Sequence, residues 1–465
     1  MSINNGKNHS PGCVVQTLPR YDDLLSLHKA LPERYPYLLE STAQADINSR
    51  YDILFAFPQH CLTLNSNSIH FDSVLNPDAS SFLDEFDQWY QREQCPDSGR
   101  NLPFTGGWFI YMGYELVSEI EPRLQFFHRD IRHLPTAFAT RITSAVIRDH
   151  KKNCTYFVSE SGYEQQNQTL LKDYQNYAAI NDDIRSEPAL ELTEETPFQF
   201  TQGVETIKEY IRAGDVFQVN LSRSWKGKLA HSAQVSNYYQ KLRETNPAPF
   251  AGLIKHNNAY IMSSSPERLV SVKNGVVEVR PIAGTRPRNE DAGVDQRLSE
   301  TLLAHPKERA EHVMLIDLER NDLGRICCPG SIEVNELMVL ESYQHVHHIV
   351  SNIRGHIKNS VSPSDVIRAV FPGGTITGCP KVRCMEIINE LEQAERGPYT
   401  GSLGYINRDG SMDLNILIRT ILADGDDISF RTGAGIVMDS DSEMELQETQ
   451  AKAKGLLLAL GVVDK

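Results

Sequence analysis

Strand-like runs that follow one another with only turns between them constrain the fold of this 465-residue chain more than any other feature. In residues 215–223, Phe217, Val219 and Leu221 alternate with Gln218 and Asn220, which predicts a strand with one polar face. Similar runs lie at 51–57, 108–111, 259–262, 276–279, 401–406, 415–420 and 428–432. Because these runs are grouped rather than separated by regular helices, they favour an α+β fold with helices packed outside antiparallel sheets.

Helical periodicity predicts helices at 306–323, 380–391 and 442–460. A further helix is expected to have Thr201 as its N-cap and to stop at Gly214. The segment 181–197 is acidic, contains prolines and predicts a linker. Since 465 residues exceed one ordinary hydrophobic core, we expect two domains or one unusually large one. The linker would separate an amino-terminal part at 1–180 from a second part at 198–465.

The net charge of the chain limits the classes of molecule that it is expected to bind. A formal net charge of −15 argues against nucleic acid, whose binding depends on Lys and Arg at the phosphates, but it is compatible with a small anion held by local basic groups. No apolar run approaches the roughly 18 residues of a membrane span, and the first residues lack the apolar core of a signal peptide. We therefore expect a cytoplasmic protein with no membrane partner.

Carboxylates on two predicted helices are candidate metal ligands. Glu311 borders the apolar face of its helix, and Glu445, Glu448 and Lys452 follow one another at helical spacing. Mg²⁺ prefers oxygen ligands and usually takes one or two carboxylates, so Glu311 and Glu448 are the candidates. The simpler alternatives are a capping box between Ser442 and Glu445 and a surface salt bridge between Glu448 and Lys452.

Glycine-rich segments and a few charged groups suggest an anion site. The segment 371–381 leads into a predicted helix with Lys381 in its first turn, a typical anion-binding arrangement. The segment 431–440 is expected to be a second small-residue turn, and Arg419 could face the same cavity. Glu267 follows the strand-breaking Pro266, where a solvated loop carboxylate is the ordinary interpretation. Together these groups suit a small dianion, with one carboxylate on Mg²⁺ and another on amides and Arg or Lys.

Ordered segments in the second part of the chain resemble the chorismate-utilising family, which includes anthranilate, aminodeoxychorismate, isochorismate and salicylate synthases. The matching segments are FQVNLS, SSSPERL, RPIAGTRPR, AEHVMLIDLERNDLGR, HVHHIVS, PGGTITGCPKVRCMEIINELE, GSLGYINRDGSMD, LIRT, GAGIVMDS and LQET. The resemblance implies an anthranilate synthase-like sandwich of two large antiparallel β-sheets with helices outside and chorismate in its cleft. It makes 1–180 an amino-terminal subdomain and 198–465 the catalytic domain.

The same resemblance implies roles for individual residues. Glu267 is expected to be the general acid that helps expel the C4 hydroxyl, and Glu311 and Glu448, with Glu445, are expected to hold Mg²⁺ against the ring carboxylate. His348 and Thr375 match polar residues near the ring. Positions expected to hold the substrate are Thr285, Tyr405, Arg419, Lys452, Gly433, Ala434 and Gly435.

The residue at position 218 indicates which nucleophile attacks chorismate. Water-using members of the family resemble this segment but have a Lys base where this chain has Gln218. A neutral amide cannot take a proton from water, whereas ammonia is already a nucleophile. Amination of chorismate is therefore favoured.

The site of amination is a choice between two branches. NSRYDIL, LPFTGGWFIYMGYEL, NPAPF and VHHIV resemble the aminodeoxychorismate branch, which leads to para-aminobenzoate and folate. Ala283 occupies the position at which many of those enzymes have a Lys thought to add to the ring, so a Lys adduct is excluded here. Anthranilate synthase component I is the alternative, and a non-catalytic protein with the chorismate fold is a second one. A zinc site at His345, His347 and His348 is a weaker alternative, because successive residues of a strand face opposite sides of the sheet.

Two binding partners are also expected. Residues that resemble the tryptophan pocket of the aminating enzymes are Ser41, Asn48, Ser49, Arg50, Pro249 and Phe250, although an ordinary strand end would explain the first of them equally well. No glutamine-hydrolysing segment is recognisable, and an amide nitrogen is a poor nucleophile. Ammonia is therefore expected to come from a separate glutamine amidotransferase subunit.

Overall fold

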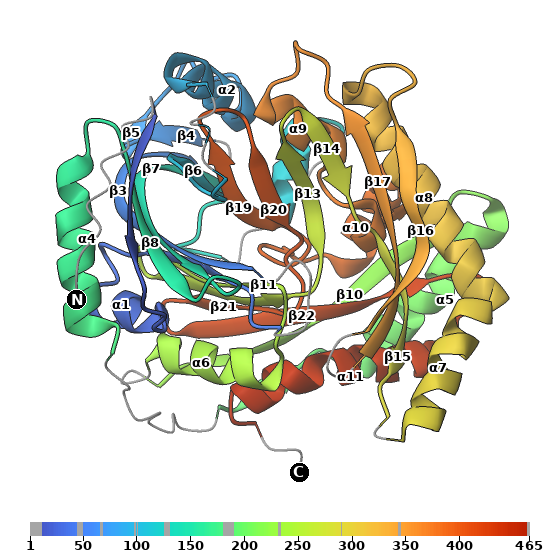
Figure 1. The fold of residues 1–465 in the computed structure, drawn as a ribbon. Helices are drawn as coiled ribbons and strands as arrows, with labels where there is room; N and C mark the ends of the chain where they lie inside the picture. The colour runs from blue at the N-terminus through green and yellow to red at the C-terminus, as the bar shows by residue number, and fades with distance from the viewer. Residues whose placement is uncertain are drawn as a thin grey trace.

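The computed structural model describes residues 12–43, 50–65, 68–96, 99, 101–124, 131–179, 190–230, 234–289, 291–342 and 346–462. Within these residues all 22 strands join one antiparallel hydrogen-bonded system. Figure 1 shows that this system is folded into two layers with helices on the outside. The α+β fold predicted from the grouped strand runs is confirmed.

The lower layer in Figure 1 combines strands from the beginning, the middle and the end of the chain. In hydrogen-bonded order it contains β9 (Leu192–Glu194), β10 (Gln218–Lys228), β22 (Asp427–Ile436), β21 (Thr420–Asp424), β12 (Ala259–Ser265), β11 (Phe250–His256) and β2 (Tyr37–Glu40). The short β18 (Gly378–Cys379) also pairs with β10.

Most strands of the upper layer lie between β12 and β21 in sequence. In order it contains β6 (Gly107–Met112), β19 (Ser402–Asn407), β20 (Met412–Asn415), β13 (Arg268–Lys273), β14 (Val276–Val279), β17 (Val346–His356) and β16 (Glu333–Ser342), with β15 (Ile282–Pro287) also on β17. The long strands β3 (Tyr51–Asn65) and β7 (Ala137–Asp149) connect β2 to β6 and so join the layers. Four short strands extend them: β8 (Cys154–Glu160), β1 (Cys13–Leu18), β4 (Ser68–Phe71) and β5 (Val74–Leu75).

Alternation along the strands gives the molecule separate core clusters on the two faces of a layer. Ile53 and Phe55 of β3 belong to the cluster that also contains Tyr405 of the upper layer. Their neighbours Leu54 and Ala56 belong to a cluster that includes residues of the outer helices. Because successive side chains point to opposite faces and both faces are covered, these strands are apolar on both sides.

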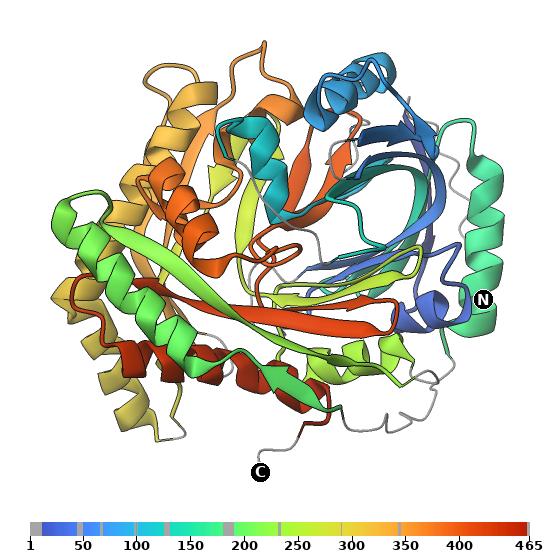
Figure 2. The same cartoon turned by 180° about the vertical axis from the view of Figure 1, so that it is seen from behind.

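Helices cover the outer faces and one end of the sandwich. Figure 1 shows α6 and α11 beneath the lower layer, and Figure 2 shows α5 alongside β10. The α-helices are α1 (Leu25–Ala30), α2 (Phe82–Glu93), α3 (Val117–Ile120), α4 (Glu164–Tyr177), α5 (Pro197–Ala213), α6 (Val235–Thr245), α7 (Ala292–Ala304), α8 (Pro306–Ile326), α9 (Pro363–Val370), α10 (Lys381–Glu392) and α11 (Ser442–Ala459). Two 3₁₀ turns are η1 (Tyr114–Leu116) and η2 (Gly374–Ile376). Among the described residues no helix is long and apolar enough to cross a membrane.

One predicted helix start and one predicted capping box are wrong. Helix α5 begins at Pro197 rather than after Thr201, since a proline at the first helical position gives up no hydrogen bond. Its end at Gly214 is confirmed, where φ is +84°. The predicted capping box of α11 does not form, because the carboxylate of Asp441 accepts the N–H groups of Glu443 and Met444 instead.

Two segments near the carboxyl terminus also differ from expectation. Residues 431–436, expected as a turn, form the end of β22 and pair with β10, since the small residues allow close backbone pairing rather than reversal. Residues 416–419, expected within one strand, leave the ladder, because β20 belongs to the upper layer and β21 to the lower one.

Part of the predicted linker lies outside the described residues. Residues 180–189 belong to that part, whereas Leu192–Glu194 forms β9 and Pro197 already starts α5. The pairings of β2 with β11 and of β6 with β19 tie the amino-terminal strands to later ones. The division at 181–197 stays a prediction.

Candidate active site

Two chain crossings between the layers bring an acid and a base together. After β12 the chain passes through Pro266 and Glu267 to reach β13, and after β20 it passes through residues 416–419 to reach β21. The crossings are hydrogen-bonded to each other, since Ile416 N donates to the carbonyl of Glu267 at 3.0 Å and Ser264 N donates to the carbonyl of Arg419 at 3.1 Å. The strand break at Pro266 therefore places Glu267 in the interior of the protein rather than in solvent.

Glu267 is a buried carboxyl with a strongly shifted proton affinity. Burial raises the pKa of this carboxyl to about 7, while a hydrogen bond from Thr375, the charge of Arg419 and the N–H of Ile282 lower it to a smaller extent. Thr375 Oγ1 donates to Glu267 Oε1 at 2.9 Å. A pKa near neutrality is what an acid that donates a proton at physiological pH requires.

Arg419 lies beside Glu267 in a strained conformation. Its backbone has φ +51°, which is unusual for a residue with a side chain. Burial lowers the pKa of its guanidinium, and the charge of Glu267 opposes that change. In the described part of the chain no side chain or carbonyl forms a hydrogen bond or ion pair with this guanidinium. A half-buried arginine without such a partner is suited to bind a carboxylate from a ligand.

His348 shares the environment of Arg419. Burial, and then the charge of Arg419, lower the pKa of this imidazole to about 4, so it is neutral at physiological pH. On β15 the buried Ala283 pairs with Ile349, and Thr285 pairs with His348 in the backbone ladder. The structure thus brings Glu267, Thr375, Arg419, His348 and the strand of Ala283 to one place.

Gln218 and Glu311 form a second part of the site. Gln218 Nε2 donates to Glu311 Oε1 at 3.0 Å, which fixes the orientation of the amide. Gln218 Oε1 is buried and has no hydrogen-bond donor among the described residues. An unpaired buried acceptor costs free energy, so this oxygen is available to a donor from a ligand.

The glycines of β22 connect this part to α11. A side chain at Gly435 would meet Gln218 Nε2 at 2.3 Å, so only glycine fits against the amide. Lys452 Nζ donates to the carbonyl of Gly433 at 2.9 Å and contacts Glu448 Oε1 at 2.7 Å. The salt bridge considered for Glu448 and Lys452 is therefore present.

The three candidate metal ligands have partners within the protein. Besides the contacts of Glu311 and Glu448, Glu445 accepts a hydrogen bond from Ser440 Oγ at 2.7 Å. Among the described residues no group of three or more His, Cys, Asp or Glu is arranged to hold a metal. Two carboxylates are enough for Mg²⁺, however, and the unpaired Gln218 Oε1 beside Glu311 could accept a proton of a metal-bound water. Carboxylate oxygens are ligands that Mg²⁺ prefers, so the donor type of these residues fits this ion.

The histidine alternative for zinc is not supported by the described residues. His347 Nδ1 contacts Ser342 Oγ at 2.7 Å and His347 Nε2 contacts Asp295 Oδ1 at 2.9 Å. Both ring nitrogens of His347 therefore already have partners in the protein. His345 lies outside the described residues.

Tyr399, rather than Tyr405, lies at the strand of Gly433. The hydroxyl of Tyr399 contacts Asn220 Oδ1 at 3.5 Å, and a side chain at Gly433 would come within 2.6 Å of it. Tyr405 instead packs against Phe104 and lines a different cavity. Sequence patterns do not single out Tyr399, because its role depends on the pairing of β22 with β10.

Helix α8 contributes further acids that sequence patterns do not identify. Glu308 lies close to Gly284, since a side chain there would meet Glu308 Oε2 at 2.9 Å. Glu319 is buried one turn before Asp322, which pairs with Lys381 at 2.6 Å. Because Lys381 binds Asp322, it is not a free anion-binding group of the turn before α10.

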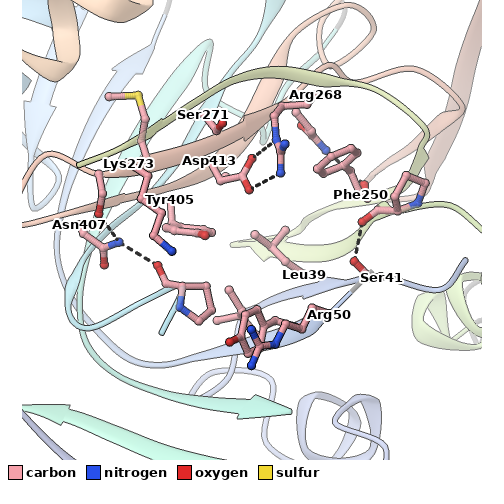
Figure 3. Close-up of a pocket in the computed structure, with 18 of the residues that line it drawn as sticks. Leu39, Ser41, Arg50, Phe250, Arg268, Ser271, Lys273, Tyr405, Asn407 and Asp413 are labelled. Carbon is pink, nitrogen blue, oxygen red and sulfur yellow. Dashed lines mark hydrogen bonds and ion pairs between the residues drawn. The ribbon is translucent and has the colours of Figure 1, made fainter. Parts of the chain in front are cut away.

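A separate cavity of about 390 Å³ collects most of the predicted tryptophan pocket. Its lining includes Ser41, Arg50, Pro249 and Phe250, together with Tyr405. Asn48 and Ser49 lie outside the described residues. Figure 3 shows Ser41, Phe250 and Tyr405 around the cavity. Arg50 lies opposite the ion pair formed by Arg268 and Asp413.

The walls of this cavity are fixed by hydrogen bonds. Ser41 Oγ donates to the carbonyl of Pro249 at 2.8 Å, and Arg268 donates to Asp413 at 2.8 and 3.0 Å. Apolar side chains with a few positioned charges and a volume of this size are typical of a small-molecule site. The cavity is lined by β2, β3, β13, β19 and β20 and does not include Glu267 or Gln218.

Comparisons with known proteins agree with this fold. The chain is 42% identical over 366 residues to an anthranilate synthase component I-like protein of Synechocystis, covering 77% of this chain and 74% of that one. It is 39% identical over 388 residues to aminodeoxychorismate synthase component 1 of Bacillus subtilis, covering 81% and 82%. Anthranilate synthase component I from Streptococcus pneumoniae has a similar structure, with a TM-score of 0.79 and 31% identity over 89% of this chain and 93% of that one. Residues 35–458 match the model of the chorismate binding enzymes, and the chain belongs to that family.

Proposed function

We propose that this protein aminates chorismate with ammonia to give 4-amino-4-deoxychorismate, a step towards para-aminobenzoate and folate. The observation that carries the proposal is the fixed amide of Gln218, whose Oε1 is buried without a donor. That oxygen can accept an N–H of ammonia but cannot remove a proton from water. A neutral acceptor at this position favours an amine nucleophile.

The protons of the proposed reaction balance between the substrate, ammonia and Glu267. The nitrogen lone pair forms the C–N bond, and the C4–O bond breaks with its electrons on oxygen. That oxygen takes the proton of Glu267 and leaves as water, while the surplus proton of the new ammonium group restores the carboxyl. Arg419, with no partner in the described protein, would hold a substrate carboxylate, and Thr375 orients Glu267.

The proposal includes a bound Mg²⁺ ion. Glu311 and Glu448 would hold it, with Glu445 as a third carboxylate, and the ion would withdraw electrons from the ring. Glu448 must then exchange its contact with Lys452 for one with the ion. Both side chains are half-exposed, so this contact can open.

Anthranilate synthase is the second candidate, with amination at C2. It is favoured by the names of several relatives and by Ala283, which excludes a covalent lysine adduct. The relative from Bacillus subtilis supports the first candidate. Mass and ultraviolet spectra of the product from chorismate, Mg²⁺ and ammonium at high pH decide between them. Retention of the enolpyruvyl group supports aminodeoxychorismate, whereas a fluorescent product without that group refutes it.

The ammonia is proposed to come from a glutamine amidotransferase subunit that docks on this chain in the cytoplasm. The purified chain should use ammonium salts but not glutamine, because the amide lone pair is delocalised. Glutamine dependence should appear when the partner is added. Turnover of glutamine by the chain alone would contradict this part of the proposal.

Tryptophan is the proposed ligand of the 390 Å³ cavity. Phe250 and Tyr405 offer aromatic surface to an indole, and Arg50 and Lys273 offer positive charge to its carboxylate. Calorimetric titration with tryptophan tests this, and Tyr405→Ala should abolish the heat. Equal binding by wild type and variant would contradict the assignment.

A further inference from the structure

The loop between α10 and β19 carries Tyr399, and its backbone is anchored on both sides of that residue. Arg396 N donates to the buried carboxyl of Glu115 at 2.8 Å. Thr400 N donates to the carbonyl of Leu417 at 2.7 Å, and the φ of +63° at Thr400 is unusual for a residue with a side chain. The backbone therefore brings Tyr399 to this place, and the direction of its ring depends on the side chains around it.

The guanidinium of Arg396 is held through every donor that it has. Nε and Nη2 donate to the two carboxylate oxygens of Glu392 at 2.9 and 2.6 Å, and Nη2 also donates to the carbonyl of Asn220 at 2.8 Å. Nη1 donates to Thr400 Oγ1 at 3.2 Å and to the carbonyl of Ile376 at 3.4 Å. A guanidinium has five N–H groups in one plane, so five acceptors fix its orientation.

This fixed guanidinium lies over two tyrosine rings. Its central carbon is 5.4 Å from the ring centroid of Tyr399 and 4.9 Å from that of Tyr114. Within the described parts of the chain it is the one cation over the Tyr399 ring. A cation is attracted to the face of an aromatic ring, most strongly where water is excluded, and both Arg396 and Tyr399 are buried. Arg396 therefore favours one direction of the Tyr399 ring.

The direction of the ring determines where its hydroxyl lies. Tyr399 Oη is 3.5 Å from Asn220 Oδ1, and a side chain at Gly433 would come within 2.6 Å of the same hydroxyl. Burial raises the pKa of Tyr399 to about 12, while the charge of Arg396 opposes this change, so the hydroxyl keeps its proton at neutral pH. Tyr399 can therefore donate a hydrogen bond at the strand that is expected to hold the substrate.

A purely structural role in neutralising Glu392 would also explain a buried arginine. Glu392 has a second cation, however, since Arg431 Nη2 donates to Glu392 Oε2 at 3.0 Å and Arg431 Nε donates to Ser222 Oγ at 2.9 Å. Both arginines are buried and share this carboxylate, but of the two only Arg396 lies over the ring of Tyr399. Comparison of the two arginines therefore separates support of Glu392 from orientation of the ring.

We propose that Arg396 is a positioning residue that orients the ring of Tyr399 and so places its hydroxyl against the bound substrate. This inference rests on the proposed function and adds a residue to it. In this role Arg396 needs no contact with the substrate and acts through Tyr399.

A double-mutant cycle on the affinity for chorismate tests the proposal. Affinity is measured by calorimetry with Mg²⁺ and without ammonia, and KM and kcat are measured with ammonium. Arg396→Lys keeps the charge but loses the planar group over the ring, so it should weaken binding and raise KM several-fold while changing kcat less. In the Tyr399→Phe background the same substitution should have no further effect, because the hydroxyl that it positions is gone. Fold changes that multiply in the double variant overturn the proposal.

Two further variants complete the test. Arg431→Lys is the matched control, and its fold change in affinity, of any size, should multiply with that of Tyr399→Phe. Coupling as strong as that of Arg396→Lys would show a general effect of the charge cluster and overturn the proposal. Thr400→Val removes one acceptor of Arg396 with little change in shape, so it replaces Arg396→Lys if that variant does not fold, and its effect should also vanish in the Tyr399→Phe background. Wild type that binds no chorismate overturns the proposed function, whereas binding with multiplying effects overturns only the role of Arg396.

Discussion

Replacing Glu267 with glutamine should abolish turnover and at the same time stabilise the fold. An amide keeps the shape of the side chain but has no proton to donate, and general acid catalysis is worth about 10²–10⁴-fold. The same burial that raises the pKa of Glu267 from 4.5 to about 7 makes its ionised form costly in the folded state. An amide has no such cost.

The magnitude of the stability change depends on pH. A raised folded-state pKa means that the free energy of unfolding is highest below pH 4.5 and falls as pH rises towards 7. The shift of about 2.5 units corresponds to about 3 kcal/mol when fully expressed. Relative to wild type, Glu267→Gln should gain about 1 kcal/mol at pH 5 and about 3 kcal/mol at pH 8.

Urea unfolding of both proteins at pH 5 and pH 8 measures this change, and the pH-independent effect of the substitution cancels in the comparison. Glu392→Gln is the opposite control, because Arg396 and Arg431 hold the pKa of that buried carboxyl below its usual value. Its variant should lose nearly the same stability at pH 5 and pH 8, because a lowered pKa makes this contribution depend on pH only below about 4.5. A stability difference for Glu267→Gln that does not increase between pH 5 and pH 8 would refute the assignment of a buried, protonated acid, as would a loss of less than tenfold in rate.

Five other substitutions test separate parts of the molecule. Glu311→Ala and Glu448→Ala should each raise the Mg²⁺ concentration needed for half-maximal rate, and an unchanged requirement would exclude them as ligands. Tyr399→Phe should raise the KM for chorismate at least several-fold and spare tryptophan binding, with Tyr405→Phe showing the reverse pattern in kinetics and calorimetry. Asp441→Ala should cost about 0.5–2 kcal/mol in urea unfolding with little effect on metal dependence, because it removes the N-cap of α11.

Local patterns in the sequence were sufficient for the elements and for the family. Strand alternation around Gln218 and the periodicity of α8 and α10 predicted those elements closely, because hydrophobic spacing and helix-ending residues act over a few positions. Ordered motifs were enough to identify a chorismate-utilising enzyme. The predicted N-cap of α11 failed because another good cap, Asp441, stands one residue before Ser442.

The tertiary structure decided which of the candidate residues meet. From the sequence, Glu267 is expected to be an exposed loop residue, and Arg419 is expected to be a strand residue. Both expectations fail because β12 and β13 lie in different layers, as do β20 and β21. Tyr399 and Tyr405 are six residues apart on one segment, yet one faces Gly433 and the other a separate cavity. Strand order and layer membership arise from pairings between residues far apart in the chain. Local sequence patterns do not determine these pairings.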